Sequence, residues 1–252
     1  MKNERIVCLV PSLTELLVDL GLRSQIVGVT KYCIHPDNLS VSRVSGTKNP
    51  NLTKIIDLQP TYLLCNREEN RLEDINYLKS ALPKCRMRIT DVGSFEDSLS
   101  TIELIAEDLD VSTKANELIS ELHQIMKNLI EVGQKFSSKP IKVLYLIWKK
   151  PWMTIGTDTY IYSMLKSLNL VSCIDDIRYP ILEADDLFER DWDVLLLSSE
   201  PYPFKDSDCL ELTSKTQRPV ILVDGEHYSW YGSRLKYVEQ TLRTELSIIF
   251  NS

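Results

Sequence analysis

The stretch VSTKANELISELHQIMKNLIEVGQKF, residues 111–136, has the pattern of one long amphipathic helix. Its apolar residues recur every three or four positions and so share one helix face: Ala115, Leu118, Ile119, Leu122, Ile125, Met126, Leu129 and Ile130. Such a helix would be about 36 Å long at ~1.5 Å per residue. Because this is long for an element inside one α/β domain, we predict a rigid connector between two lobes.

Short apolar runs alternate with helical patterns on both sides of this stretch. Strands are expected at Arg5–Val10, Ile26–Thr30, Thr61–Cys65, Arg86–Thr90, Ile141–Ile147, Met153–Ile155, Asp193–Leu197 and Pro219–Val223. The alternation is typical of α/β layers with largely parallel sheets. The sequence therefore predicts an α/β fold of two Rossmann-like lobes with a ligand cleft between them. The expected parts are an N-terminal lobe (1–111), a long connecting helix (112–137) and a C-terminal lobe (138–252).

Composition narrows the function classes. The chain has 252 residues, of which 43% are hydrophobic and 26% charged, and its net charge is -7. This balance argues against nucleic-acid binding, and no stretch reaches the roughly 20 apolar residues of a membrane span. The first residues lack a signal-peptide pattern. We therefore expect a cytoplasmic location for the sequence as given, and a periplasmic or cell-surface one only if a leader is missing.

Aromatic and polar residues gather where the expected strands end. Ligands of open parallel sheets bind beyond the carboxyl ends of the strands, and aromatic walls with a few polar groups are typical of small-molecule sites. Candidate ligand-binding residues at these exits are Tyr32, His35, Trp148, Trp152, Glu200, Tyr202, Glu226, His227, Tyr228 and Trp230. The same rings would alternatively serve as core packing or as a protein–protein surface.

Two histidines follow strands of opposite lobes. His35 and His227, together with Glu226, form a candidate nitrogen and oxygen site for zinc, manganese or iron. A cytosolic metal-binding protein or enzyme would use the same cleft, with His35, Glu200, Glu226 and His227 as ligands or acid/base groups. The sequence has no phosphate-binding glycine motif and no nucleophile elbow. We therefore predict a non-enzymatic protein that binds a small molecule or a metal chelate.

The motif Pro11-Ser12-Leu13-Thr14-Glu15 after the first strand adds a family resemblance. Together with the long helix, the segment 46–60 and Tyr179-Pro180, it resembles the helical-backbone class of ABC-importer substrate-binding proteins, nearest to the cobalamin-binding branch. The resemblance implies a cobalamin-like, haem-like, siderophore-like or chelated-metal ligand. It also implies ligand contacts at Tyr32, Trp148, Trp152, Tyr179, Glu226, His227 and Tyr228.

The resemblance further implies a partner. Members of this class dock to arginines of an ABC permease through an acidic residue on each lobe. Thr53 stands at the position of the first-lobe acid, so that docking residue is missing, and the second lobe offers Asp185. The sequence therefore predicts a substrate-binding protein related to ABC import.

Overall fold

The computed structural model describes residues 4–183 and 185–252, and the chain divides into two compact units. Lobe 1 consists of Met1–Val92, Glu96–Glu121 and Tyr231–Arg234. Lobe 2 consists of Gly93–Phe95, Leu122–Trp230 and Leu235–Ser252. The short segment 231–234 thus packs with lobe 1, although the residues on both sides of it belong to lobe 2.

The sheet of lobe 1 is parallel throughout the described residues. Its spatial order is β3 (Ser42–Arg43), β2 (Ile26–Val29), β1 (Ile6–Cys8), β4 (Tyr62–Asn66) and β5 (Arg86–Thr90). The central strands β1 and β4 are buried along their whole length. Burial on both faces is what a parallel sheet covered by helices requires, and it explains the continuous apolar runs of these strands.

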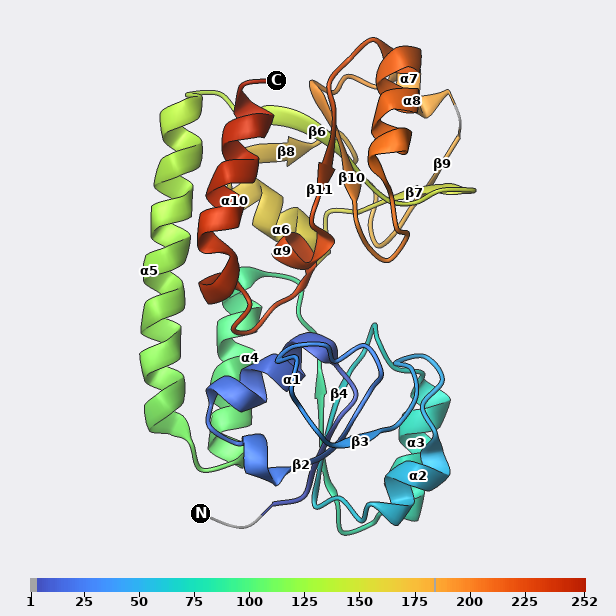
Figure 1. The fold of residues 1–252 in the computed structure, drawn as a ribbon, viewed down its shortest axis with the longest axis vertical. Coiled ribbons are helices and arrows are strands. Elements are labelled where there is room, and N and C mark those ends of the chain that lie inside the picture. Colours follow the sequence, from blue (N-terminus) through green and yellow to red (C-terminus); the bar gives the residue numbers. More distant parts are fainter. Residues whose placement is uncertain (1–3, 184) are drawn as a thin grey trace. The chain divides into compact units, whose positions relative to one another are not determined.

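Helices cover both faces of this sheet (Figure 1). One face carries α2 (Leu52–Asp57) and α3 (Leu72–Ala81), and the other carries α1 (Pro11–Asp19) and α4 (Phe95–Asp108). Pro11 opens α1, a position where the missing N–H of proline costs nothing and its fixed φ favours the helix. A single 3₁₀ turn, η1 (Arg23–Gln25), leads into β2.

The sheet of lobe 2 mixes strand directions. Its order is β11 (Val220–Val223), β10 (Val194–Ser198), β6 (Ile141–Trp148), β7 (Trp152–Thr154) and β9 (Ile181–Leu182), and β8 (Leu170–Ser172) also pairs with β6. The strands β6, β8, β10 and β11 are parallel, whereas β7 runs antiparallel to both β6 and β9. The chain leaves β6 at Trp148 and enters β7 at Trp152. In the turn between these strands, Lys150 has a φ of 64°.

The helices of lobe 2 are α6 (Tyr160–Ser167), α7 (Asp186–Glu189), α8 (Asp206–Thr216), α9 (Gly225–Ser229) and α10 (Leu235–Phe250). Figure 1 shows α7 and α8 on one side of the sheet and α6, α9 and α10 on the other. The long helix α5 (Ser112–Phe136) contributes its residues from Leu122 onward to this lobe. There it packs against α10, where the rings of Phe136 and Phe250 stack with centroids 5.5 Å apart.

The α/β class and the two parallel-sheet lobes predicted from the sequence are confirmed. Each of the expected strands is present within two residues of its expected ends, and the helical stretch 111–136 forms α5. The sequence patterns missed the short strands β3, β8 and β9 and the helices α8 and α9. Among the described residues, none of the helices combines the length and apolar character needed to cross a membrane.

Candidate ligand-binding site

The strand exits of lobe 2 lie at one edge of its sheet. The strands β6, β10 and β11 are parallel neighbours, so the segments that follow them leave from the same edge. Trp148 is the last residue of β6, Glu200 follows β10 and Glu226 follows β11. Ligands of open α/β sheets bind at such an edge.

An aromatic wall, which we define as Trp148, Trp152, Tyr202 and Phe204, stands at this edge. Its rings touch in series with edge-on or stacked geometry. The centroid distances are 5.7 Å for Trp148–Tyr202, 4.7 Å for Tyr202–Phe204 and 6.3 Å for Trp152–Phe204. All three distances fall in the range that favours aromatic pairing. Phe204 is buried in the core of the lobe, whereas 39% of Trp148 is exposed. The wall is therefore packed into the core through Phe204 and exposed to solvent at Trp148.

Lys149 holds the turn that carries this wall. Its Nζ lies 2.6 Å from Asp208 Oδ1 and 3.3 Å from Glu211 Oε2, both on α8, and 5.8 Å from the centroid of the Trp152 ring. The side chains of Lys149 and Asp208 are only 15% and 13% exposed, so water screens this pair less than it would a surface pair. The aromatic wall is therefore rigid before any ligand arrives.

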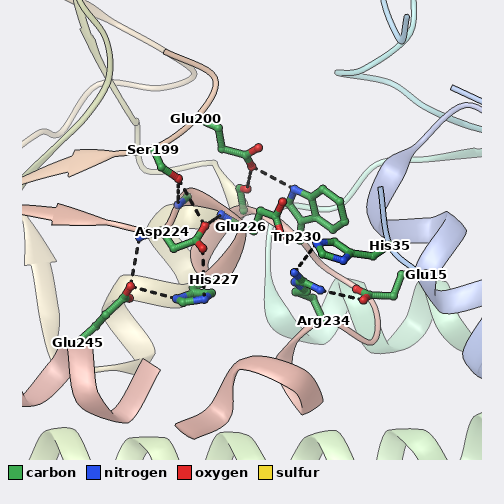
Figure 2. Close-up of polar contacts among 12 residues, drawn as sticks. Glu15, His35, Ser199, Glu200, Asp224, Glu226, His227, Trp230, Arg234 and Glu245 are labelled. Carbon is green, nitrogen blue, oxygen red and sulfur yellow. Dashed lines mark hydrogen bonds and ion pairs between the residues drawn. The ribbon is translucent and has the colours of Figure 1, made fainter. Parts of the chain in front are cut away.

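Glu200 precedes Tyr202 of the wall by two residues, and its side chain contacts residues that follow β11 (Figure 2). Its Oε1 accepts hydrogen bonds from the hydroxyl of Ser229 at 2.9 Å and from the indole Nε1–H of Trp230 at 3.0 Å. Burial raises the pKa of Glu200 above its ordinary value; the two hydrogen bonds oppose the rise, and the nearby Glu226 carboxylate adds to it. The carboxylate is thus a fixed acceptor at this edge.

We expect Glu200→Gln to stabilise the protein near neutral pH. The raised pKa means that the folded state binds the Glu200 proton more tightly than the unfolded state does. The stability that this proton contributes is complete below the unfolded pKa and is lost as the pH rises through the folded pKa. Glutamine does not titrate, so its unfolding free energy should decline less between pH 4.5 and 8. Urea unfolding at several pH values measures this, and parallel curves for wild type and variant would contradict the prediction.

The helix α9 begins at a cap formed by Asp224. The Asp224 carboxylate accepts from the backbone N–H of Glu226 at 3.0 Å, and Ser199 Oγ accepts from the backbone N–H of Gly225 at 3.0 Å. An N-cap of this kind satisfies a backbone donor that a helix start leaves open. The two strand exits are therefore joined by side-chain to backbone bonds at the start of α9.

His227 lies between two carboxylates. Its Nδ1 is 3.1 Å from Glu245 Oε1 on α10, and its Nε2 is 3.6 Å from Asp224 Oδ2. Only 7% of His227 is exposed, and Tyr228 is fully buried against the ring of Tyr145 at 5.8 Å. Neither predicted ligand contact offers a surface to a ligand, so we leave both His227 and Tyr228 out of the proposed site. They fasten α9 to the body of lobe 2.

The remaining residues predicted in lobe 2 keep some exposure. Trp152, Tyr179, Tyr202, Glu226 and Trp230 are half-buried. The Arg178 guanidinium lies 6.0 Å from the centroid of the Tyr179 ring, just before the edge strand β9. These residues stay available to a ligand, and their assignment to the site stays a prediction.

Lobe 1 has a cluster of buried charged residues near the edge of its sheet where the strands end. Arg234 Nη1 lies 2.8 Å from Glu15 Oε1, and Arg234 Nη2 lies 2.7 Å from His35 Nε2 (Figure 2). The side chains of Arg234 and Glu15 are only 11% and 8% exposed. An arginine can only donate, so His35 Nε2 is the acceptor in this contact. Tyr32, three residues earlier, is 51% exposed under the ammonium of Lys31.

The pKa of Glu15 reflects the burial of the Glu15–Arg234 pair. Burial raises the pKa of Glu15, and the positive charge and hydrogen bond of Arg234 oppose the rise. The second oxygen of Glu15, Oε2, is buried without a hydrogen-bond partner among the described residues. The Glu15 carboxylate therefore depends on Arg234 for its charge to be tolerated in the folded state.

The metal site predicted for His35, Glu226 and His227 stays a prediction, and the local geometry does not favour it. Among the described residues, the side chains of His, Cys, Asp and Glu form no group of three that would hold a metal ion. Nε2 of His35 accepts from Arg234, and both ring nitrogens of His227 face carboxylates. These three ring nitrogens each have a partner within their own lobe.

Sequence reasoning missed the roles of Glu15 and Arg234. Glu15 is the last residue of the motif Pro11-Ser12-Leu13-Thr14-Glu15, and Arg234 follows Trp230 by four residues. They are 219 residues apart in the sequence, and a local pattern holds no information about such a pair.

Comparisons with known proteins agree with this architecture. The model of a family described as periplasmic binding protein matches residues 6–218. An uncharacterised ABC transporter substrate-binding lipoprotein of Bacillus subtilis is 28% identical over 177 residues, which are 69% of this chain and 56% of that protein. The chain thus spans little more than half the length of this relative. The vitamin B12-binding protein of Vibrio cholerae is 21% identical over 204 residues, which are 77% of this chain and 70% of the relative.

A solved structure shares the fold over almost the whole chain. The periplasmic haem-binding protein RhuT of Roseiflexus superposes with a TM-score of 0.83, at 18% sequence identity, covering 98% of each chain.

These matches correct the expected location. The cytoplasmic expectation is wrong, because the family and the relatives are periplasmic proteins or lipoproteins and point to an extracytoplasmic location. The expectation rested on the first residues of the sequence alone. These residues indicate the location only when they include a leader sequence.

Proposed function

The chain belongs to the periplasmic binding protein family, and we propose that it is the substrate-binding component of an ABC importer, working outside the cytoplasmic membrane. The relatives named above are an ABC transporter substrate-binding lipoprotein and a vitamin B12-binding protein. They are transport proteins rather than enzymes, which supports a binding role over the enzymatic alternative.

The ligand that we propose is a large tetrapyrrole of the cobalamin or haem type. The observation that carries this choice is the aromatic wall of lobe 2, with Trp148 at its exposed end and Trp152 stacked on Phe204 at an interplanar angle of 3°. Flat, rigid rings offer a large apolar surface to a planar ligand with little loss of side-chain freedom. Trp230 and Tyr179, both half-buried, would add further ring surface.

Lobe 1 has a different set of groups near its own strand exits. Tyr32 is half-exposed, and the ammonium of Lys31 lies 4.8 Å from the centre of its ring. A cation beside an exposed ring suits a ligand that combines an apolar face with acidic or amide groups at its rim. Both cobalamin and haem have this combination.

The proposed partner is an ABC permease that meets exposed residues of the short helices α2 and α7. Thr53 is exposed in the first turn of α2, next to Lys54, and Asp185 is exposed at the start of α7. With one acidic side chain in place of two, docking would depend on Asp185. We expect Asp185→Ala to weaken binding to the permease and to leave ligand affinity unchanged.

Thermal unfolding in the presence of candidate ligands tests the function. A ligand that binds only the folded state at about 100 times its dissociation constant adds about 2.7 kcal/mol of stability. Cyanocobalamin or haemin should therefore raise the unfolding temperature of the wild type. The Trp152→Ala variant serves as the control for the aromatic wall and should respond much less. The proposal would be abandoned if neither tetrapyrrole shifts the wild-type transition.

A further inference from the structure

We propose that Glu200 is a positioning residue that sets the orientation of the Trp230 indole, and that it does not itself contact the ligand. This inference rests on the proposed tetrapyrrole-binding function. It gives Glu200 a role different from the direct ligand contact expected from its place at a strand exit.

The geometry of the Trp230 indole carries the argument. A tryptophan side chain has a single polar group, the Nε1–H donor. Trp230 directs this donor at Glu200 Oε1, 3.0 Å away, and the same oxygen also accepts from Ser229 Oγ at 2.9 Å (Figure 2). One strong hydrogen bond at the edge of the ring fixes its rotation, while the half-buried ring keeps part of its surface exposed.

The acceptor is itself held in place. The backbone carbonyl of Glu200 accepts from Ser198 Oγ at 2.6 Å, and Ser198 Oγ in turn accepts from the buried hydroxyl of Tyr145 at 3.1 Å. Ser198 and Tyr145 are buried in the sheet, at 1% and 0% exposure. A series of hydrogen bonds therefore links the core to the indole, from Tyr145 through Ser198 and Glu200 to Trp230.

Gly225 is the residue that lets Glu200 lie across the start of α9. A Cβ at this position would stand 2.5 Å from Glu200 Cγ and 2.5 Å from Ser198 Oγ. Real side chains do not approach so closely, so a larger residue at 225 would displace Glu200 or α9. Gly225 thus allows the segments that follow β10 and β11 to pack closely where Glu200 reaches Trp230.

The Glu200 carboxylate also lowers the stability of the folded state, which an uncharged hydrogen-bond acceptor would not do. Burial raises the pKa of Glu200, and the Glu226 charge adds to the rise, so the ionised form lowers stability near neutral pH. Glutamine would accept from Ser229 and Trp230 without this cost. A charged acceptor, however, makes a shorter and stronger hydrogen bond, which favours a firmly oriented indole over maximal stability.

A double-mutant cycle separates positioning from direct contact. The variants are Glu200→Leu, Trp230→Phe and the double variant, and the readout is the affinity for cyanocobalamin and for haemin. Leucine removes the acceptor, and phenylalanine keeps a ring but lacks the N–H donor. We expect Glu200→Leu to weaken binding about tenfold in the wild type and less than about twofold in the Trp230→Phe background. Equal factors in both backgrounds would mean that Glu200 touches the ligand, and no loss of affinity in either background would also overturn the proposal.

A second measurement needs no ligand and so distinguishes failure of this inference from failure of the proposed function. The indole N–H signal of Trp230, identified in ¹⁵N NMR spectra by its absence in Trp230→Phe, should exchange with solvent faster in Glu200→Leu. Glu200→Gln is the matched control, because it keeps the acceptor, and Glu200→Ala removes the acceptor without added bulk if leucine prevents folding. An indole signal unchanged by loss of the acceptor would refute positioning. Absence of tetrapyrrole binding beside a changed signal would refute only the proposed function.

Discussion

Replacing Arg234 with alanine is expected to lower the free energy of unfolding by about 3–5 kcal/mol at neutral pH, the usual cost of leaving one member of a buried ion pair alone. Arg234 contacts Glu15 at 2.8 Å, and both side chains are about nine-tenths buried. In the variant, the Glu15 carboxylate would keep its burial and lose its cation. It would also lose the anchor that fastens the segment 231–234 to lobe 1.

The pH dependence of this loss identifies its cause. Burial raises the pKa of Glu15, and Arg234 is the main group opposing the rise. Without Arg234, the pKa of Glu15 in the folded state rises further. The destabilisation should therefore be largest above that pKa and shrink as the pH falls and Glu15 becomes protonated in both folded and unfolded chains. Urea unfolding at pH 3.5, below the ordinary glutamate pKa of 4.5, and at pH 8 measures both limits.

The matched control replaces the whole pair. In Glu15→Leu/Arg234→Met no buried charge remains, so this double variant should be more stable at pH 8 than Arg234→Ala. A loss in Arg234→Ala that is below about 1 kcal/mol, a value usual for exposed pairs, or one that does not depend on pH, would contradict the buried-pair explanation.

The Trp152→Ala variant is expected to bind the tetrapyrrole about 30- to 140-fold more weakly than the wild type, as for an aromatic hot-spot residue worth about 2–3 kcal/mol. Trp152 stacks on Phe204, and Lys149 from the same turn lies over its ring. Its removal takes away the ring at one end of the aromatic wall and exposes Phe204. Titration by visible absorbance gives the two dissociation constants.

Tyr237→Ala provides the control for this prediction. Tyr237 is a 53% exposed aromatic residue on α10 of the same lobe, and it is neither in the aromatic wall nor among the predicted ligand contacts. Its loss should leave the affinity unchanged. Equal affinities for wild type and Trp152→Ala, with both proteins folded by circular dichroism, would show that the aromatic wall does not form the site.

The sequence predicted best where a periodic pattern is long. The apolar stripe of residues 111–136 covers seven turns, and it forms the helix α5 as expected. The missed helix α8 has a mixed face of short polar residues with one buried leucine, Leu212. The missed strands β3 and β9 have two residues each, and runs this short have no period to detect.

The site shows a different limit. The segment after β11 was expected to be a loop in which Glu226, His227, Tyr228 and Trp230 all face a ligand. It is instead the helical turn α9, and a helical turn sends successive side chains in different directions. Glu226 and Trp230, four residues apart, share one face and stay half-buried, whereas His227 and Tyr228 turn into the lobe. Predicting which residues are exposed required the helix to be recognised first.

The partners of Arg234 could not be predicted at all. Glu15 and His35 lie 219 and 199 residues away from it along the chain. Such contacts depend on how the segment 231–234 returns to lobe 1, which is a property of the tertiary fold and not of any local pattern.

Isothermal titration calorimetry of the purified chain with cyanocobalamin and with haemin tests the central claim most directly. We predict one binding event per chain for at least one of the two, with a dissociation constant below about 1 μM, that is, a binding free energy beyond about -8 kcal/mol. The negative heat-capacity change that accompanies burial of apolar rings should appear when the titration is repeated at several temperatures. Absence of binding heat for both tetrapyrroles across those temperatures would contradict the account.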